Sequence, residues 1–459
     1  MSYINWVFHC LVSLYRAGLW LYLSSVVGQA GGYLFWLVVA ALANTSTLGE
    51  VAYLVSLSGI FTTLLSVGLP SAVMHLYPAT GDRRYAEGAL AYTLALSLAA
   101  AAAYAWRPVL SLLVATGLLS AIYSAYLQAR LDTKPIFAAT AAGQAARVLL
   151  VPLLLPLGPD ALAASYAIPG LLLIATTAGK GLRPRLWGLR ELAPAGISVW
   201  APGVVSVLGT NLGVVAAYHL AEAEAAGLVY IAQVLAGAAV APVTVVTGAL
   251  LPYLSSTPDK APRSVKAARL ALAISAPLAA VMITGGGHVL ALLGSRYVQA
   301  YPALAVFTAG NLVSTMSGVL STLTYAEGRY AATLAGGVLA NATRVLLYLA
   351  LGTAPLGIAT SFLAGSAAHL AFFSILQRRV AANVGGLTPR LLASSLPALA
   401  LSPLGLIPAT AGALLSYMLA VRLGLVTRGE LADVAKQILP DLVYAKIAPL
   451  AARVLDLVT

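Results

Sequence analysis

The chain has 459 residues, of which 60% are hydrophobic and only 9% are charged. Soluble domains carry about 25% charged residues, so this composition excludes soluble enzymes and nucleic-acid binders with wetted basic faces. A single cysteine, Cys10, excludes a disulfide-stapled secreted module. Most of the protein surface is therefore expected to face lipid.

Fourteen apolar stretches of about 20 residues follow one another along the chain, separated by short polar loops. Such stretches predict membrane-spanning helices, because a helix satisfies its own backbone hydrogen bonds in lipid. The predicted fold class is therefore an all-α polytopic membrane protein with about 14 transmembrane helices. In chain order the stretches cover residues 17–43, 50–77, 87–106, 108–128, 135–157, 160–179, 195–218, 225–254, 266–285, 300–324, 331–352, 355–377, 389–405 and 407–424.

The two ends of the chain differ from these stretches. Residues 1–16 contain aromatic residues and no small-residue cleavage pattern, which indicates an interfacial lead-in and not a cleaved signal peptide. Residues 427–459 mix charged and apolar residues at helical spacing, which predicts an amphipathic cytoplasmic tail.

The basic residues fall mainly on one side of the predicted membrane. Of the 26 lysines and arginines, 22 lie in the end segments and in alternate loops, two lie in the opposite loops, and two lie within spans. Lysine and arginine prefer cytoplasmic loops, so both termini are expected in the cytoplasm and the protein in the plasma membrane. This asymmetry also accounts for the net charge of +12 without a nucleic-acid partner.

Two arginines lie within predicted spans, Arg147 in the fifth and Arg344 in the eleventh. An arginine at the bilayer centre costs about 2.5–3.5 kcal/mol on insertion scales, so each is expected to face protein or water and to find a partner. Gln144 lies three residues before Arg147, and Asn341 lies three residues before Arg344. This spacing places the amide and the guanidinium on one helix face in both spans.

The two arginines belong to a predicted internal repeat with an offset of 197 residues. With one gap, residues 163–166 align with 359–362, and a second correspondence pairs residues 49–53 with residues 227–230. Because a six-helix unit has an even number of spans, both copies are expected to insert with one orientation around a central cavity. The expected domains are two six-helix bundles as parallel repeats, two additional helices and the tail, at residues 1–194, 195–385, 386–426 and 427–459.

Several short segments form an ordered series along the chain: Gly68-Leu69, Leu251–Ser255, Leu293–Ala300, Ala326–Arg329, Asn341 and Pro355–Ser361. Together with the helix count, this series resembles the polysaccharide-biosynthesis flippases of the multidrug/oligosaccharidyl-lipid/polysaccharide (MOP) exporter superfamily. The resemblance covers residues from about 17 to 426.

The resemblance implies a transporter without enzymatic activity that moves a lipid-linked oligosaccharide from the cytoplasmic to the outer leaflet by alternating access. The carrier would be an isoprenoid phosphate or pyrophosphate. In that family the central cavity is formed mainly by the first, second, seventh and eighth helices, and a sugar chain needs such a polar cavity because buried hydroxyls without partners are costly. Substrate-binding residues expected on these helices are Gln29, His75, Asn211, Gln233 and Tyr253.

Arg147 and Arg344 have two open interpretations: a structural role inside one lobe, or a paired phosphate site. Pro202 and Pro242 are candidate hinges, because prolines bend helices and the seventh and eighth helices line the expected cavity. No cofactor and no metal are expected. The expected partners are a lipid-linked oligosaccharide, membrane lipids and glycosyltransferases of the same pathway, with the protein acting as a monomer.

Two alternative functions are open. A cation-coupled multidrug antiporter of the same superfamily would rely on an acid within the membrane, whereas all fourteen acids fall in predicted loops, at helix ends or in the tail. An integral membrane glycosyltransferase or polymerase would need an acid pair or a metal-binding cluster. The sequence has no DxD motif, and its five histidines are scattered over separate helices and loops.

Overall fold

The computed structural model describes residues 3–179, 181–243, 250–255, 259–427 and 429–430. Within these residues, 13 helices are long and apolar enough to cross a membrane, and Leu406–Arg422 forms a shorter apolar helix. The predicted all-α polytopic membrane protein of about 14 helices is thereby confirmed. The chain divides into two compact units, residues 1–230 and 231–459.

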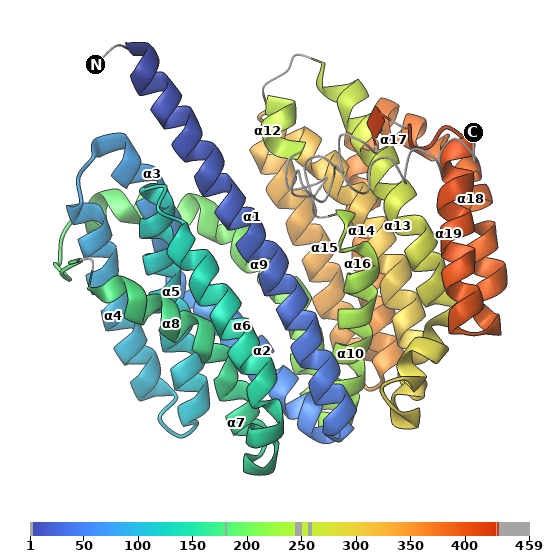
Figure 1. Ribbon diagram of the computed structural model, residues 1–459, viewed down its shortest axis with the longest axis horizontal. Helices are drawn as coiled ribbons and strands as arrows, with labels where there is room; N and C mark the ends of the chain where they lie inside the picture. Colours follow the sequence, from blue (N-terminus) through green and yellow to red (C-terminus); the bar gives the residue numbers. More distant parts are fainter. Residues whose placement is uncertain (1–2, 180, 244–249, 256–258, 428, 431–459) are drawn as a thin grey trace. The chain divides into compact units, whose positions relative to one another are not determined.

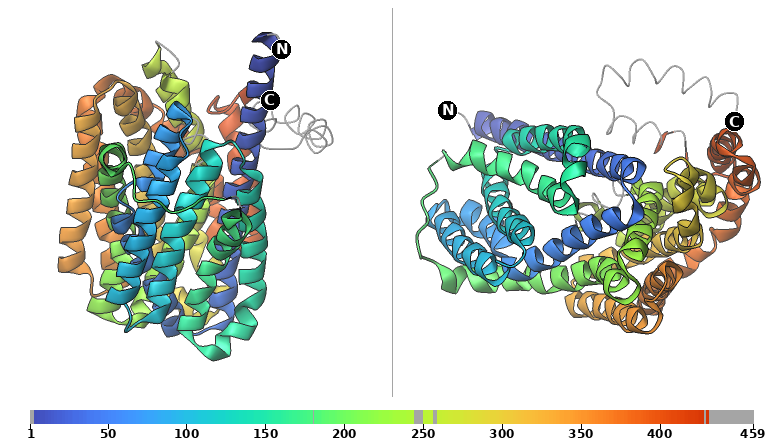
Figure 2. Two further views of the ribbon diagram at one scale, coloured as in Figure 1. Left: turned by 90° about the vertical axis from the view of Figure 1, so that its left-hand side faces the viewer. Right: turned by 90° about the horizontal axis from the view of Figure 1, so that it is seen from below.

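Unit 1 contains helices α1 to α9 and the first two turns of α10 (Figure 1). Their bounds are α1 (Tyr3–Leu42), α2 (Thr45–Ser66), α3 (Leu69–Thr80), α4 (Arg84–Ala103), α5 (Pro108–Ala129), α6 (Lys134–Leu154), α7 (Pro159–Ala164), α8 (Ile168–Ala178), α9 (Leu189–Ala221) and α10 (Ala223–Val240). Helix α1 packs along α6, α2 packs against α5 and α9, and α4 packs against α5. Figure 2 shows these helices from the side and end-on.

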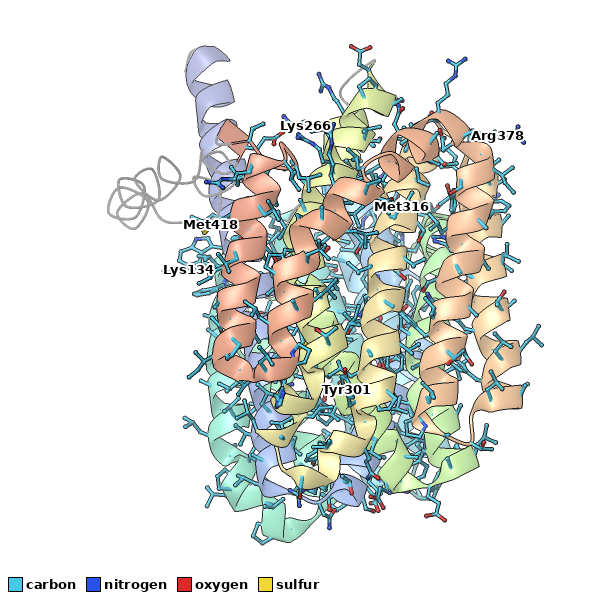
Figure 3. The ribbon with its side chains drawn as sticks, turned by 90° about the vertical axis from the view of Figure 1, so that its right-hand side faces the viewer. Lys134, Lys266, Tyr301, Met316, Arg378 and Met418 are labelled. Carbon is cyan, nitrogen blue, oxygen red and sulfur yellow. The ribbon has the colours of Figure 1, made fainter. Side chains whose placement is uncertain are left out.

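Unit 2 contains the rest of α10 and α12 to α19. Their bounds are α12 (Leu250–Ser255), α13 (Lys260–Ala291), α14 (Tyr301–Ala326), α15 (Tyr330–Leu351), α16 (Pro355–Leu376), α17 (Arg378–Gly385), α18 (Thr388–Leu401) and α19 (Leu406–Arg422). Helix α14 packs against α13 and α16, and α18 packs against α19. Figure 3 shows Lys266 and Arg378 at one end of this unit and Tyr301 toward the other.

Three predicted spans are not continuous α-helices. Residues 50–77 form α2 and α3, and residues 160–179 form α7 and α8 joined by a 3-10 turn that precedes Pro169. The eighth span ends early, because α10 stops at Val240 and Pro242 lies in the turn that follows. Proline removes a backbone donor and restricts the residue before it, which accounts for the last two interruptions but not for the first.

The start of the C-terminal tail is held on unit 2 through Glu430. Its carboxylate accepts bonds from Arg269 at 2.6 Å, from Lys266 at 3.2 Å and from the Thr427 backbone N–H at 2.9 Å. Burial alone would raise the pKa of Glu430, but the hydrogen bonds from Thr427 and Lys266 and the charge of Arg269 hold that pKa below its ordinary value. Residues 431–459 of the predicted tail lie outside the described residues.

Candidate functional site

The interruption between α2 and α3 rests on two consecutive residues with positive φ, Val67 at 46° and Gly68 at 71°. Glycine adopts this region freely, whereas a β-branched valine is strained there. Gly68 also has no room for a side chain, because a Cβ on it would lie 2.1 Å from the carbonyl oxygen of Gly196 on α9. Discontinuous helices of this kind form the substrate sites of many transporters.

Helix α9 supplies the hydrogen bonds that the broken helix lacks. The indole Nε1 of Trp200 donates to the carbonyl oxygens of Thr63 at 2.8 Å and Leu64 at 3.2 Å. These carbonyls stand in the last turn of α2, where backbone partners run out and where Thr63 also accepts from Ser66 Oγ at 2.9 Å. If α9 moves relative to α2, either the end of α2 moves with it or these hydrogen bonds break.

Three residues expected in the cavity lie on the helices of unit 1. Gln29 is exposed on α1, and its Nε2 donates to Ser25 Oγ at 3.1 Å. His75 is exposed on α3, beyond the interruption. Asn211 is half-buried on α9, and its Nδ2 donates to the carbonyl oxygen of Val207 at 3.2 Å. Both bonds lie within a single helix, so the side-chain amides of Gln29 and Asn211 can each form further hydrogen bonds to another partner.

The remaining expected residues lie elsewhere. Gln233 is half-buried on α10, and Pro242 is exposed in the turn after that helix, both in unit 2. Tyr253 lies on α12 and Pro202 within α9, and their side chains are outside the described part of the structure. A single cavity lined by all of these residues stays a prediction.

Arg147 is buried within unit 1, with 3% of its surface exposed. Its guanidinium carbon lies 4.1 Å from the ring centre of Tyr166 and 4.6 Å from that of Phe35. The hydroxyl of Tyr166 is hydrogen-bonded to Tyr230, and the ring centre of Trp36 lies 5.8 Å from that of Tyr166 and 4.2 Å from that of Tyr230. Cation–π contacts contribute about 2 kcal/mol each when desolvated, which offsets the cost of a buried charge.

Arg344 is held differently within unit 2. Its Nη1 donates to Asn341 Oδ1 at 3.2 Å, and its Nη2 donates to Ser366 Oγ at 3.0 Å. Ser366 in turn contacts Ser314 Oγ at 2.8 Å. The guanidinium also lies 4.5 Å from the ring centre of Phe362. One hydrogen bond within α15 and one to α16 therefore hold this arginine.

Each arginine contacts the aromatic residue at the aligned position of the repeat, Tyr166 in one copy and Phe362 in the other. The contribution of Phe35 and Trp36 could not be read from the repeat, because they lie on α1, more than 100 positions before Arg147. The cluster of aromatic residues at 33–36 was the available signal.

Helices α2 and α10, which align in the repeat, cross at two glycines. A Cβ on Gly49 would lie 1.7 Å from the carbonyl oxygen of Ala223, and a Cβ on Gly227 would lie 2.2 Å from that of Thr45. The contact is reciprocal, since each glycine meets the backbone four residues before the other. Such self-complementary contact is typical of a two-fold axis.

Two tyrosines extend this reciprocal pattern. Tyr53, which follows Gly49 on α2, stacks on Tyr218 of α9 with ring centres 4.1 Å apart and planes 12° from parallel. Tyr230, which follows Gly227 on α10, packs on Trp36 of α1. The second helix of each copy thus places an aromatic ring on the first helix of the other copy. Aromatic pairs of this kind contribute about 0.5–1.5 kcal/mol beyond area burial.

Acids are confined to the ends of the described helices and to loops, and none lies more than six residues from a helix end. In the same part of the chain, no group of three or more His, Cys, Asp or Glu could hold a metal ion. Within the described spans the buried charged residues are Arg147 and Glu87, near the start of α4, whereas Arg344 is half-buried.

No protein-family model matches the chain, and no curated protein sequence matches it. Among solved structures, the chain is similar to the lipid II flippase MurJ in an inward closed conformation, with a TM-score of 0.70 and 11% identity, covering 87% of this chain and 97% of that one. It is also similar to a multidrug-resistance MATE-family transporter of the MOP superfamily in an outward-facing conformation, with a TM-score of 0.54 and 13% identity over 81% and 96% of the two chains.

A third similar structure is a MOP-superfamily transporter from Pyrococcus furiosus, for which a reversed polarity of the binding pocket is said to suggest a different function. Its TM-score is 0.50 with 14% identity, over 81% of this chain and 96% of that one. The resemblance carried by the short motifs is thus confirmed for the fold. The chain is a multi-pass membrane protein with the fold of the MOP-superfamily transporters.

Proposed function

We propose that the protein moves a lipid-linked oligosaccharide, carried on an isoprenoid phosphate or pyrophosphate, from the cytoplasmic to the outer leaflet of the plasma membrane. It does so as a monomer with both termini in the cytoplasm. Lobes at 1–194 and 195–385 rock against each other, and polar residues on helices one, two, seven and eight receive the sugars. No bond is made or broken.

The buried cation Arg147 carries this proposal. Coupling to a cation relies on an acid within the membrane, but the described acids sit near helix ends. Arg147, in contrast, is a buried cation without a carboxylate partner among the described residues. A positively charged interior favours an anionic substrate such as a lipid phosphate. The fold shared with a lipid II flippase supports the same substrate class.

The direct test is translocation by purified protein in liposomes that contain a fluorescent isoprenoid-linked oligosaccharide. Accessibility of the sugar to an external glycosidase reports its movement between leaflets. We expect time-dependent translocation that requires the protein. Gln29→Leu, His75→Leu, Asn211→Leu and Gln233→Leu should each slow it, since a hydrogen bond contributes about 0.5–1.5 kcal/mol net, roughly a factor of 2 to 13.

A matched control is Gln128→Leu. Gln128 on α5 donates to Ser124 Oγ at 3.0 Å, four residues earlier, in the same way that Gln29 donates to Ser25. If Gln128→Leu slows translocation as much as Gln29→Leu, the site assignment is wrong. Efflux of drugs driven by an imposed proton gradient, without movement of the lipid, would contradict the proposal and favour the antiporter.

A further inference from the structure

The internal repeat allows a comparison of two arginines whose Nη groups have different partners, while Nε is buried without a hydrogen-bond partner in both among the described residues. Arg344 donates to an amide and to a hydroxyl, so Nη1 and Nη2 both have acceptors. Arg147 has the same helix position in its copy, yet its contacts are the faces of two rings. Rings offer no lone pairs in the guanidinium plane, so they cannot accept from the N–H groups of Arg147, and its Nε is buried without a hydrogen-bond partner among the described residues.

The residue beside Arg147 is unsatisfied as well. Gln144 Oε1 and Arg147 Nε are both buried without a hydrogen-bond partner among the described residues. In the other copy, the amide at this position accepts a bond from its arginine. The side chain of Gln144 is instead pressed against α1, since a Cβ on Gly31 would lie 2.6 Å from its Cβ. An unpaired cation and an unpaired amide therefore lie one helical turn apart on α6.

Tyr230 covers this pair from α10. Its hydroxyl is hydrogen-bonded to Tyr166, the ring on which Arg147 lies, and its ring packs on Trp36. Tyr230 follows Gly227 by one turn, so it can approach α1 only while the two glycines let α10 lie against α2. Separation of α10 from α2 would withdraw Tyr230 and uncover the guanidinium.

We propose that Arg147 and Gln144 form an anion site for the phosphate or pyrophosphate of the carrier, and that Tyr230 closes this site until α10 withdraws. The identity of the anion rests on the proposed function. Arg147 lies thirteen residues after Lys134, about 20 Å along α6 from the end expected in the cytoplasm. The site thus lies in the outer half of the membrane, where it receives the head group late in transport.

The contact chemistry fits a phosphate. A guanidinium presents parallel donors that pair with two oxygens of a phosphate, and these charge-assisted bonds are about twice as strong as neutral ones. The amide of Gln144 supplies two further donors, or an acceptor for a protonated phosphate. The rings of Tyr166 and Phe35 hold the guanidinium in one plane, which reduces the side-chain entropy lost on binding.

The test measures binding by the purified full-length protein with three probes: farnesyl diphosphate, inorganic pyrophosphate and uncharged farnesol. Tyr230→Ala removes the cover and is expected to strengthen binding of farnesyl diphosphate at least tenfold over the unmodified protein. Adding Arg147→Gln to Tyr230→Ala should abolish that gain, and adding Arg147→Lys should restore part of it. The control pair, Tyr230→Ala with Arg344→Gln, should retain the gain.

Each outcome has a defined consequence. Tighter binding of both diphosphates but not of farnesol supports a phosphate site, and tighter binding of farnesyl diphosphate alone shows that the lipid chain is part of recognition. A gain that is the same for farnesol, or that survives Arg147→Gln, overturns the proposal. Melting temperatures of all variants identify loss of folding, in which case Tyr230→Phe, which removes only the hydroxyl, replaces Tyr230→Ala. Binding without any translocation in liposomes would keep the anion site and reject the flippase function.

Discussion

Replacing Gly227 with alanine should force α10 away from α2. The added Cβ would lie 2.2 Å from the carbonyl oxygen of Thr45, whereas ordinary contact begins at 3.4 Å, so the helices must separate by about 1.2 Å. Overpacking costs about 1–3 kcal/mol, and alanine returns about 0.5–1 kcal/mol in helix propensity. The net loss of about 1–2 kcal/mol corresponds to a 5- to 30-fold shift toward the separated arrangement.

Hydrogen–deuterium exchange of the purified protein measures this shift. Segments 45–53 and 223–230 should exchange 5- to 30-fold faster in Gly227→Ala, because exchange follows local opening. Gly337→Ala on α15 is the matched control, since nothing lies within 4 Å of a Cβ placed there. If Gly227→Ala exchanges and melts like Gly337→Ala, the two helices do not meet at these glycines and the reasoning is refuted.

Three further changes test other parts of the structure. Val67→Gly should raise the melting temperature, because it relieves a left-handed strain of about 1–2 kcal/mol that exceeds the added chain entropy; a lower melting temperature would contradict this. Trp200→Phe keeps an aromatic ring but removes the indole donor from the carbonyls of Thr63 and Leu64, of which Thr63 keeps the bond from Ser66 Oγ, so it should lower the free energy of unfolding by about 0.5–1.5 kcal/mol; denaturant unfolding that is unchanged would reject these bonds. The pKa of Glu430 is lowered by hydrogen bonds and charge although burial opposes this, so its stabilising effect is present above about pH 4.3 and is lost as the pH falls through the folded-state pKa. Limited proteolysis after residue 430 should therefore become faster on acidification in the natural protein and should be fast at every pH in Glu430→Gln. If the natural protein and Glu430→Gln are cleaved at equal rates at neutral pH, the pairing of Glu430 with Lys266 does not hold the tail.

The spans were predictable because lipid imposes the same demand on every stretch of about 20 residues, independently of the rest of the chain. The interruption at Val67 was not predictable, since valine disfavours the conformation that it adopts there. Its support comes from Gly196 and Trp200 on α9, more than 120 positions later. Tertiary contacts therefore override the local preference.

The candidate site, too, was predictable from the sequence only in part. Periodicity and insertion cost pointed to Arg147 and to the need for a partner. The spacing of Gln144 suggested an amide as that partner, and the structure shows that this bond forms in the second copy but not in the first. Which acceptors reach a buried arginine depends on how α1 packs along α6, and no local pattern in the sequence contains that information.

The reciprocal glycine crossing has an evolutionary consequence. If the repeat arose by fusion of two identical chains, the ancestor was a symmetric homodimer, and a single glycine codon supplied both sides of the contact. One mutation then created or destroyed the interface twice over. After fusion, the crossing had to keep both glycines, while positions away from the axis were free to diverge, which is how one copy could retain an arginine bonded to an amide and a hydroxyl and the other an arginine packed between two rings.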